Sequence, residues 1–450
     1  MSSSEYLSVS PGIESYQDTI DFLFGLQRFG IKLGLENINR MLKSFGNPHL
    51  KLKTVHIAGS NGKGSVAAFV ANIFQKAGYR VGLYTSPHLS DFSERIRING
   101  KPINPDEVIH LTRLIRKKQY KVAEEDGNIG SPVSVINMTF FEFTTLLAFL
   151  YFHQKKVDLA VVEVGMGGRL DATNVVKPLV SVITNIAREH QQYLGNTLEK
   201  ISREKAGIIK SNGILITAVT QPRILAQFRS RCREMGSLIY RVGKEIKIKE
   251  NSQGAFDYQG IYNSYKRLKI NILGKYQIIN AALAVGTAEL LAKKGYLVDE
   301  NSIREGLWDT RWPGRLELVN LKPRVLLDGA HNLAAVERLK IALLNDFSYR
   351  RLFLVIGIMG DKSIKPILKR LVPLGNYIIF TRPQMERAAS PYSLLKSARS
   401  FTNRVEVVED VKQAVRKAMV RARNDDLICV TGSLFTVGEA RELFYSRVEI

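Results

Sequence analysis

Short runs of apolar, β-rich residues recur along this chain and alternate with stretches of helical periodicity. Runs that stay apolar at every position are typical of strands buried on both faces, as in parallel sheets covered by helices. In the first half of the chain, such runs occupy residues 54–59, 81–86, 159–165, 179–186 and 213–217. The sequence therefore predicts an α/β fold built on a mainly parallel sheet.

A second series of apolar runs follows the stretch WDTRWPGRLE at residues 308–317, with a natural boundary at 312–314. Between the two series, residues 238–272 alternate in shorter runs and predict antiparallel hairpins. The second series predicts a smaller, Rossmann-like, doubly wound domain with strands at 324–329, 351–357, 377–380, 405–409 and 426–432. We therefore expect one domain over residues 1–309 and another over residues 310–450.

Cysteine usage and hydropathy indicate a cytoplasmic protein. Cys232 and Cys429 lie far apart and form neither a disulfide framework nor a metal-binding spacing. No apolar run approaches the roughly 20 residues that span a bilayer. The N-terminus lacks the basic start and apolar stretch of a secretory signal. We therefore expect no membrane association.

The net charge of +23 is open to two interpretations, an anionic partner or a surface that is simply rich in lysine and arginine. A nucleic acid would fit the first, and so would a small polyanion such as a nucleotide or an oligoglutamate. The basic clusters at 113–121 and 416–424 predict solvated helix faces, and no zinc knuckle, helix-turn-helix or RNA-recognition motif accompanies them. We expect small-molecule partners and no nucleic acid, with a nucleic-acid-stimulated P-loop ATPase as an alternative.

A glycine-rich loop, HIAGSNGKGS at residues 56–65, follows the first predicted strand and precedes a helical stretch. In this context, backbone N–H groups and a helix N-terminus hold phosphate oxygens. The spacing departs from the common P-loop, since Gly59 stands three residues before Gly62 and the serine comes one residue late. Lys63 would reach the β- and γ-phosphates, and Ser65 would offer a hydroxyl. The predicted nucleotide-binding residues of the loop are Gly59, Ser60, Asn61, Gly62, Lys63, Gly64 and Ser65.

Two side chains at later strand ends predict a metal site beside this loop. Glu163 lies at the end of the strand at 159–165, and His190 follows the strand at 179–186. A carboxylate in this place is well positioned to hold the magnesium that nucleotide chemistry needs. The alternatives are an ion pair between Glu163 and Arg169 and a structural histidine. On the residues alone, Lys205 is an ordinary solvated helix lysine.

Motifs along nearly the whole chain resemble the folylpolyglutamate synthase/dihydrofolate synthase family, a branch of the Mur ligases. The resemblance implies a P-loop-type, Mur-ligase ATP-binding domain and a Rossmann-like glutamate ligase domain. It also explains the unusual loop spacing, because this family carries a shortened phosphate loop. The matching stretches are HIAGSNGKGS, YTSPHL, ERIRINGKPI, EVGMGGRLDATN, TNIAREHQQYLGNT, REKAGIIK, WPGRLE and LDGAHN.

The resemblance also implies roles for individual residues. Ser86, Glu163 and His190 match metal ligands, while Lys63 matches the phosphate-loop lysine. Lys205 matches a lysine carried as a carbamate, which would act as an anionic ligand for a second magnesium and requires a depressed amine pKa. Four further positions match residues near the nucleotide, namely Asn280, Arg315, Asp328 and His331.

The activity implied by the resemblance is ATP-dependent joining of L-glutamate to a carboxylate through an acyl phosphate. ATP and two magnesium ions are the implied cofactors, and a monomer is expected. The acceptor stays open between dihydropteroate, reduced folates and both, with the bifunctional enzyme preferred. A related ligase with another acceptor is a further alternative, whereas a non-catalytic relative should have lost Lys63, Glu163 or His190.

Three positions depart from the family pattern, and one segment is ambiguous. Tyr276 stands where relatives usually have histidine, so we expect adenine binding to be altered rather than lost. Ala187 and Glu189 replace the usual glycine and aspartate. The segment 136–149 resembles the acceptor side of these enzymes, but its aromatics, Phe140, Phe141 and Phe143, could equally be core residues.

Overall fold

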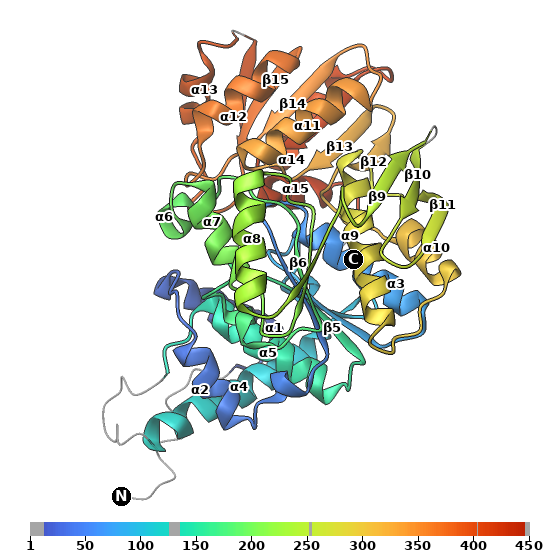
Figure 1. Ribbon diagram of the computed structural model, residues 1–450. Helices are drawn as coiled ribbons and strands as arrows, with labels where there is room; N and C mark the ends of the chain where they lie inside the picture. Colours follow the sequence, from blue (N-terminus) through green and yellow to red (C-terminus); the bar gives the residue numbers. More distant parts are fainter. Residues whose placement is uncertain (1–12, 126–135, 252–253, 403, 446–450) are drawn as a thin grey trace, which may run out of the picture.

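The computed structural model describes residues 13–125, 136–251, 254–402 and 404–445, which form two large sheets with helices on both faces and a small three-stranded sheet (Figure 1). The larger sheet has the strand order β4-β3-β2-β5-β1-β6-β7-β8. Six of its strands are parallel, and the first five confirm the predicted runs. The six are β1 (Thr54–Ala58), β2 (Val81–Tyr84), β5 (Leu159–Glu163), β6 (Val180–Ile183), β7 (Ile214–Thr217) and β8 (Leu238–Arg241).

Two details of this half differ from the prediction. β8 was expected in an antiparallel hairpin, yet it pairs parallel with β7, because α8 (Pro222–Glu234) provides the crossover between them. Two short strands, β3 (Ile96–Ile98) and β4 (Lys101–Pro102), add an antiparallel edge that was not predicted. The rest of the predicted hairpin region forms a three-stranded antiparallel sheet of β9 (Lys247–Glu250), β10 (Ala255–Gln259) and β11 (Ser264–Lys269).

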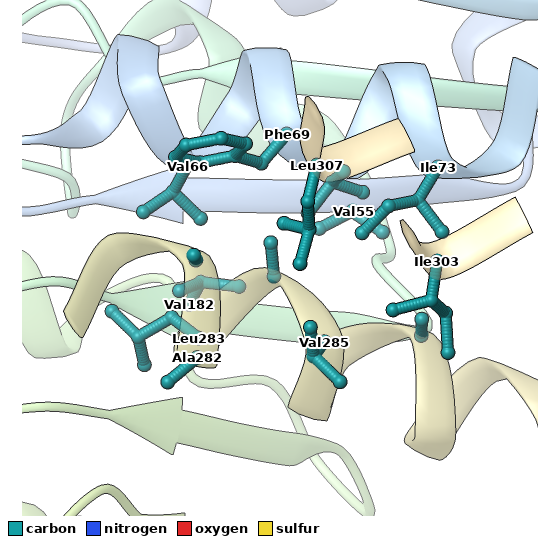
Figure 2. Packing of buried hydrophobic residues seen from close by; sticks show 14 of the residues in the cluster. Val55, Val66, Phe69, Ile73, Val182, Ala282, Leu283, Val285, Ile303 and Leu307 are labelled. Atoms are coloured by element: carbon teal, nitrogen blue, oxygen red, sulfur yellow. The ribbon is translucent and has the colours of Figure 1, made fainter. Parts of the chain in front are cut away.

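Alternate residues of each central strand serve two cores on opposite faces of the large sheet. Val55 and Ile57 of β1 face α3 (Lys63–Lys76), α9 (Tyr276–Ala292) and α10 (Glu300–Asp309). Figure 2 shows this core, with Val66 and Phe69 of α3 above Leu283 and Val285 of α9. The other face packs against α1 (Tyr16–Gly25), α2 (Glu36–Ser44), α4 (Pro105–Glu125), α5 (Phe140–Gln154), α7 (Leu198–Ala206) and α8.

The second sheet has the order β12-β13-β17-β14-β15-β16 and contains the five predicted strands in parallel. A sixth strand, β12 (Glu317–Leu321), pairs antiparallel with β13 at the edge and was not predicted. The parallel strands are β13 (Arg324–Asp328), β14 (Leu352–Ile356), β15 (Tyr377–Arg382), β16 (Val405–Asp410) and β17 (Leu427–Thr431). The doubly wound class is therefore confirmed.

Helices cover both faces of this sheet as well. One core contains α11 (Leu333–Asn345), α12 (Ile364–Leu371) and α13 (Pro391–Ala398), and the other contains α14 (Val411–Arg421) and α15 (Leu434–Arg441). The short helices elsewhere are α6 (Gln191–Leu194), η2 (Leu26–Phe29), η3 (Pro48–Lys51), η4 (Phe92–Arg95), η5 (Ala172–Val175) and η7 (Val372–Leu374). Among the helices of the described ranges, none is both long and apolar enough to cross a membrane.

Candidate active site between the two sheets

The phosphate loop is held from behind by residues that directly follow β6. The Asn61 carbonyl accepts hydrogen bonds from the Thr184 hydroxyl and from the Asn185 amide, both at 2.7 Å. The Asn185 side-chain oxygen in turn accepts the Asn61 N–H at 3.1 Å, and the backbone carbonyl of Asn185 accepts the Ser60 N–H at 2.9 Å. These four bonds fix the loop between β1 and α3 before any ligand is present.

The start of α3 lies close against α9. Gly62 precedes this helix with φ +85, and a Cβ added there would lie 2.7 Å from the Asn280 amide oxygen. The close approach explains why glycine is needed, and it places Asn280 beside the loop as predicted. Ser65 is buried in the first turn of α3. Tyr276 precedes Asn280 by one turn of α9, and the Arg338 guanidinium lies 5.4 Å from its ring centre.

Glu163 ends β5 next to the phosphate loop, where the strand-end argument predicted it. Its carboxylate accepts the Ser86 N–H at 3.2 Å and lies 4.0 Å from the Lys63 ammonium. Burial raises the pKa of the Glu163 carboxyl, and the nearby Lys63 works against that shift. The alternative pairing of Glu163 with Arg169 is wrong, because Arg169 pairs with Glu204 at 2.9 Å.

Lys205 is a buried residue of the site, so its prediction as a solvated lysine from the residues alone is wrong. It is 1% exposed, and its ammonium contacts Glu189 at 2.7 Å and the Gly59 carbonyl at 3.1 Å. Burial lowers the pKa of Lys205, while Glu189 opposes this. His190 lies in the same small hollow as Lys63 and Lys205. Burial also lowers the pKa of His190 to about 4, so its imidazole is neutral at neutral pH.

The second sheet brings its predicted residues to the same place. Asp328, at the end of β13, accepts the N–H groups of Leu316 and Ala330, both at 3.0 Å. His331 Nδ1 lies 2.8 Å from the Gly329 carbonyl oxygen, and burial lowers the pKa of this histidine to about 4. Arg315 lowers the pKa of Asp328, although burial raises it overall. The loops that follow the two sheets are joined by a hydrogen bond of 3.0 Å, which the Asn332 side chain donates to the Asn61 side chain.

The predicted metal ligands fit a magnesium ion better than a transition metal. Glu163 offers a carboxylate, Ser86, whose backbone N–H contacts that carboxylate, has a hydroxyl, and His190 offers a neutral ring nitrogen. Within the described ranges, no cluster of three or more histidine, cysteine or acidic side chains forms a metal site. Magnesium suits such a sparse set, because it keeps several waters and takes phosphate oxygens from the substrate.

A large cavity of about 890 Å³ opens beside Ser86 and His190. Its walls include Phe24, Phe140 and Phe141, together with Phe435 from α15 of the second sheet. Phe143, in contrast, is fully buried in the core, so the ambiguous aromatic segment divides between the two roles. A cavity with aromatic walls and this volume suits a bicyclic aromatic acceptor.

Sequence reasoning did not single out Thr184, Asn185 or Asn332, although they connect the loop to both sheets. Thr184 and Asn185 lie at the end of the predicted run 179–186, directly after β6, at the same sheet edge as Glu163. Polar residues at a strand end beside a phosphate-loop strand were the available signal. Asn332 gave no comparable signal, because its contact depends on how the second sheet is placed.

This fold and site define a nucleotide-dependent ligase of the Mur class. The family described as Mur ligase middle domain matches residues 57–288, and the Mur ligase, glutamate ligase domain matches residues 314–434. The two matches cover both sheets and the residues gathered between them.

Relatives narrow the family further. The chain is 36% identical to a dihydrofolate synthase/folylpolyglutamate synthase of Bacillus subtilis, over 95% of this chain and 99% of that protein. It is similar to the crystal structure of a Thermotoga maritima folylpolyglutamate synthase, at 38% identity and a TM-score of 0.82, covering 96% and 97% of the two chains. An Escherichia coli FolC structure in complex with DHPP and ADP matches at 30% identity and a TM-score of 0.84, covering 96% and 99%. The chain therefore belongs to the dihydrofolate synthase/folylpolyglutamate synthase family of Mur ligases, as its motifs predicted.

Proposed function

We propose that this chain uses ATP to join L-glutamate, through an amide bond, both to dihydropteroate and to the γ-glutamyl end of reduced folates. The observation that carries the proposal is that Ser86, which lines the aromatic cavity, donates its N–H to Glu163 beside the phosphate loop. Lys63, 4.0 Å from Glu163, marks where the γ-phosphate would lie. The Bacillus subtilis relative, whose name includes both activities, supports the bifunctional assignment.

The reaction has two steps. In the first, the acceptor carboxylate attacks the γ-phosphorus of ATP, the bond to the bridging oxygen breaks, and ADP and an acyl phosphate form. In the second, the amine of L-glutamate attacks the acyl carbon, orthophosphate leaves with its oxygen, and the amine loses a proton. Phosphorylation is needed because a carboxylate oxygen is a poor leaving group.

The residues of the chain contribute mainly positioning and charge. Lys63 neutralises negative charge on the transferring phosphoryl group, and the loop N–H groups orient it. The aromatic walls hold the acceptor with its carboxylate toward Ser86, so that the attack is in line. Magnesium, held by Ser86, Glu163 and His190, would act as a Lewis acid on the phosphate oxygens. Asn280, Arg315, Asp328 and His331 would hold the nucleotide from the other side.

Several finer points belong to the same proposal. We infer a second magnesium ion and a carbamate on Lys205, which the burial of its amine favours and its ion pair with Glu189 opposes. The division into residues 1–309 and 310–450 follows the change from the first sheet to the second. We further propose a cytoplasmic monomer that acts on small molecules without nucleic acid.

The test is ADP release by the purified protein with MgATP and L-glutamate. Dihydropteroate, tetrahydrofolate and single-stranded DNA are added in separate reactions, and the products are identified by mass spectrometry. Turnover with both pterins is the expected result, and each product should gain the mass of one glutamyl residue. Turnover with one pterin would assign a single activity. Hydrolysis stimulated by DNA alone would reject the ligase proposal.

A further inference from the structure

A second cavity, of about 210 Å³, shares the segment from Ser86 to Leu89 with the aromatic cavity. Glu163 and Gly64 of the phosphate loop also line it, so it opens at the reaction centre. Its character is different, because its lining carries several guanidinium groups. We call it the arginine cavity, defined by Arg97, Arg311, Arg315, Arg441 and Trp312.

Among the described residues, the positive charges of this cavity are only partly neutralised. Arg441 has a close partner in Glu317 at 3.0 Å. The Arg97 guanidinium lies 3.9 Å from the Glu94 carboxylate, which already accepts three backbone N–H bonds at 2.8 to 3.0 Å, and the Arg97 Nε donates to the Glu94 backbone carbonyl at 3.0 Å. Within the same described ranges, no carboxylate forms an ion pair with Arg311 or Arg315, which bond to neutral oxygens.

Trp312 orients part of this charge and links it to the phosphate loop. The Arg97 guanidinium lies over the Trp312 ring, 5.6 Å from the ring centre, in a cation–π contact that helps to hold it in place. The other edge of the same indole touches the loop, since a Cβ at Gly64 would lie 2.8 Å from it. A partly buried, oriented guanidinium with spare donors is suited to bidentate recognition of an oxyanion.

We propose that the arginine cavity binds a small oxyanion of the second reaction step, either a carboxylate of incoming L-glutamate or the orthophosphate that leaves. The volume of about 210 Å³ admits either anion but is too small for a pterin with its benzoyl group. The proposal rests on the proposed function. It adds a site that shares the Ser86–Leu89 segment with the acceptor cavity.

Tryptophan fluorescence tests binding directly, because the chain contains only two tryptophans. A Trp308→Phe background leaves Trp312 as the sole reporter, and saturating MgADP keeps the phosphate loop filled. Titration with L-glutamate or with orthophosphate should give a saturable change for at least one of them, and chloride should give none. In this background, Arg97→Gln should weaken that binding about tenfold, which corresponds to about 1.4 kcal/mol.

Arg97→Lys keeps the charge but loses the planar guanidinium. Its affinity for the anion should lie between those of the parent and of Arg97→Gln. Arg116→Gln is the matched control, since Arg116 also stacks on a ring, that of Phe22 at 4.6 Å, but far from this cavity. It should bind as the parent does. Arg311→Gln gives the same comparison if circular dichroism shows that Arg97→Gln does not fold. No saturable change, or equal binding by Arg97→Gln and its parent, would overturn the proposal.

Steady-state kinetics distinguish the two anions. If the cavity holds glutamate, Arg97→Gln raises the KM for L-glutamate about tenfold while the KM for ATP stays constant. If it holds phosphate, the same variant relaxes product inhibition by orthophosphate and leaves the KM for L-glutamate unchanged. The fluorescence titration needs no folate and no turnover. Failure of every folate to react would therefore reject the proposed function without altering the binding result.

Discussion

Replacing Gly59 by alanine tests whether the residues after β6 hold the phosphate loop in its working shape. Gly59 has φ +144, which L-residues rarely adopt, and a Cβ there would lie 1.9 Å from the Thr184 hydroxyl oxygen. Thr184 has little freedom to move, because its hydroxyl donates to the Asn61 carbonyl at 2.7 Å and its own nitrogen would be 3.1 Å from the new Cβ.

The expected destabilisation follows from two contributions. A residue forced into a sparsely populated backbone region raises the free energy of the folded state by about 1–3 kcal/mol. Loss of the bond from Thr184 to Asn61 adds about 1 kcal/mol. The sum is about 3 kcal/mol, and displacement of the loop by about 1 Å should lower kcat/KM for ATP by about 10²-fold.

Gly78→Ala is the matched control. Gly78 also has a positive φ, +89, but an added Cβ would meet no atom within 4 Å, so only backbone strain of about 1–2 kcal/mol remains. Thermal unfolding with and without MgADP compares the two variants. Gly59→Ala should unfold at the lower temperature and gain less from MgADP. Equal unfolding temperatures and equal gains would show that Thr184 does not shape the loop.

Three further predictions concern the site. Lys63→Met should reduce kcat by about 10²–10³-fold in an ADP-release assay, because the substitution removes the positive charge that neutralises the transferring phosphoryl group. A wild-type rate would contradict the proposed role of Lys63. With ¹³C-bicarbonate, the parent should show a carbamate resonance that Lys205→Arg lacks, and its absence from the parent would argue against carbamylation. Phe143→Ala should lower stability by about 3–5 kcal/mol in thermal unfolding, since its ring is fully buried. Phe141→Ala should instead raise the acceptor KM about tenfold. If both substitutions change stability and the acceptor KM equally, Phe143 and Phe141 do not differ in role as core and cavity residues.

Hydrophobic runs predicted the parallel strands because burial on both faces leaves a strong signature in the sequence. The strands at the edges carry no such signature. β4 has only two residues, and β12 mixes polar and apolar positions. The residues of β8 are half-exposed or exposed, so its sequence lacks the continuous apolar run of a buried strand. Its parallel pairing depends on the crossover helix α8 rather than on its own residues.

The site divides in the same way between local and long-range information. Glu163 was predictable from its place at the end of a strand, and the loop glycines from their context. Lys205 was predicted only through the resemblance to the family, because its contact with Gly59 joins positions 146 residues apart. Its side chain is ordinary in sequence and unusual only in its burial. For Asp328 and His331, the resemblance to the family gave what local physics could not.

The arrangement of the two sheets explains why a phosphate-loop fold and a Rossmann-like fold occur in one chain. In parallel sheets, ligands bind at the carboxyl ends of the strands, and here two such edges face the same space. Asn332 joins them, because its side chain caps α11 through the Ala335 N–H at 2.9 Å and also donates to Asn61 at 3.0 Å. The start of α11 is therefore fixed to the loop that would hold phosphate. The loop and the start of α11 are thus held together without a ligand, and the space that would protect an acyl phosphate from water is complete only when both sheets are in place.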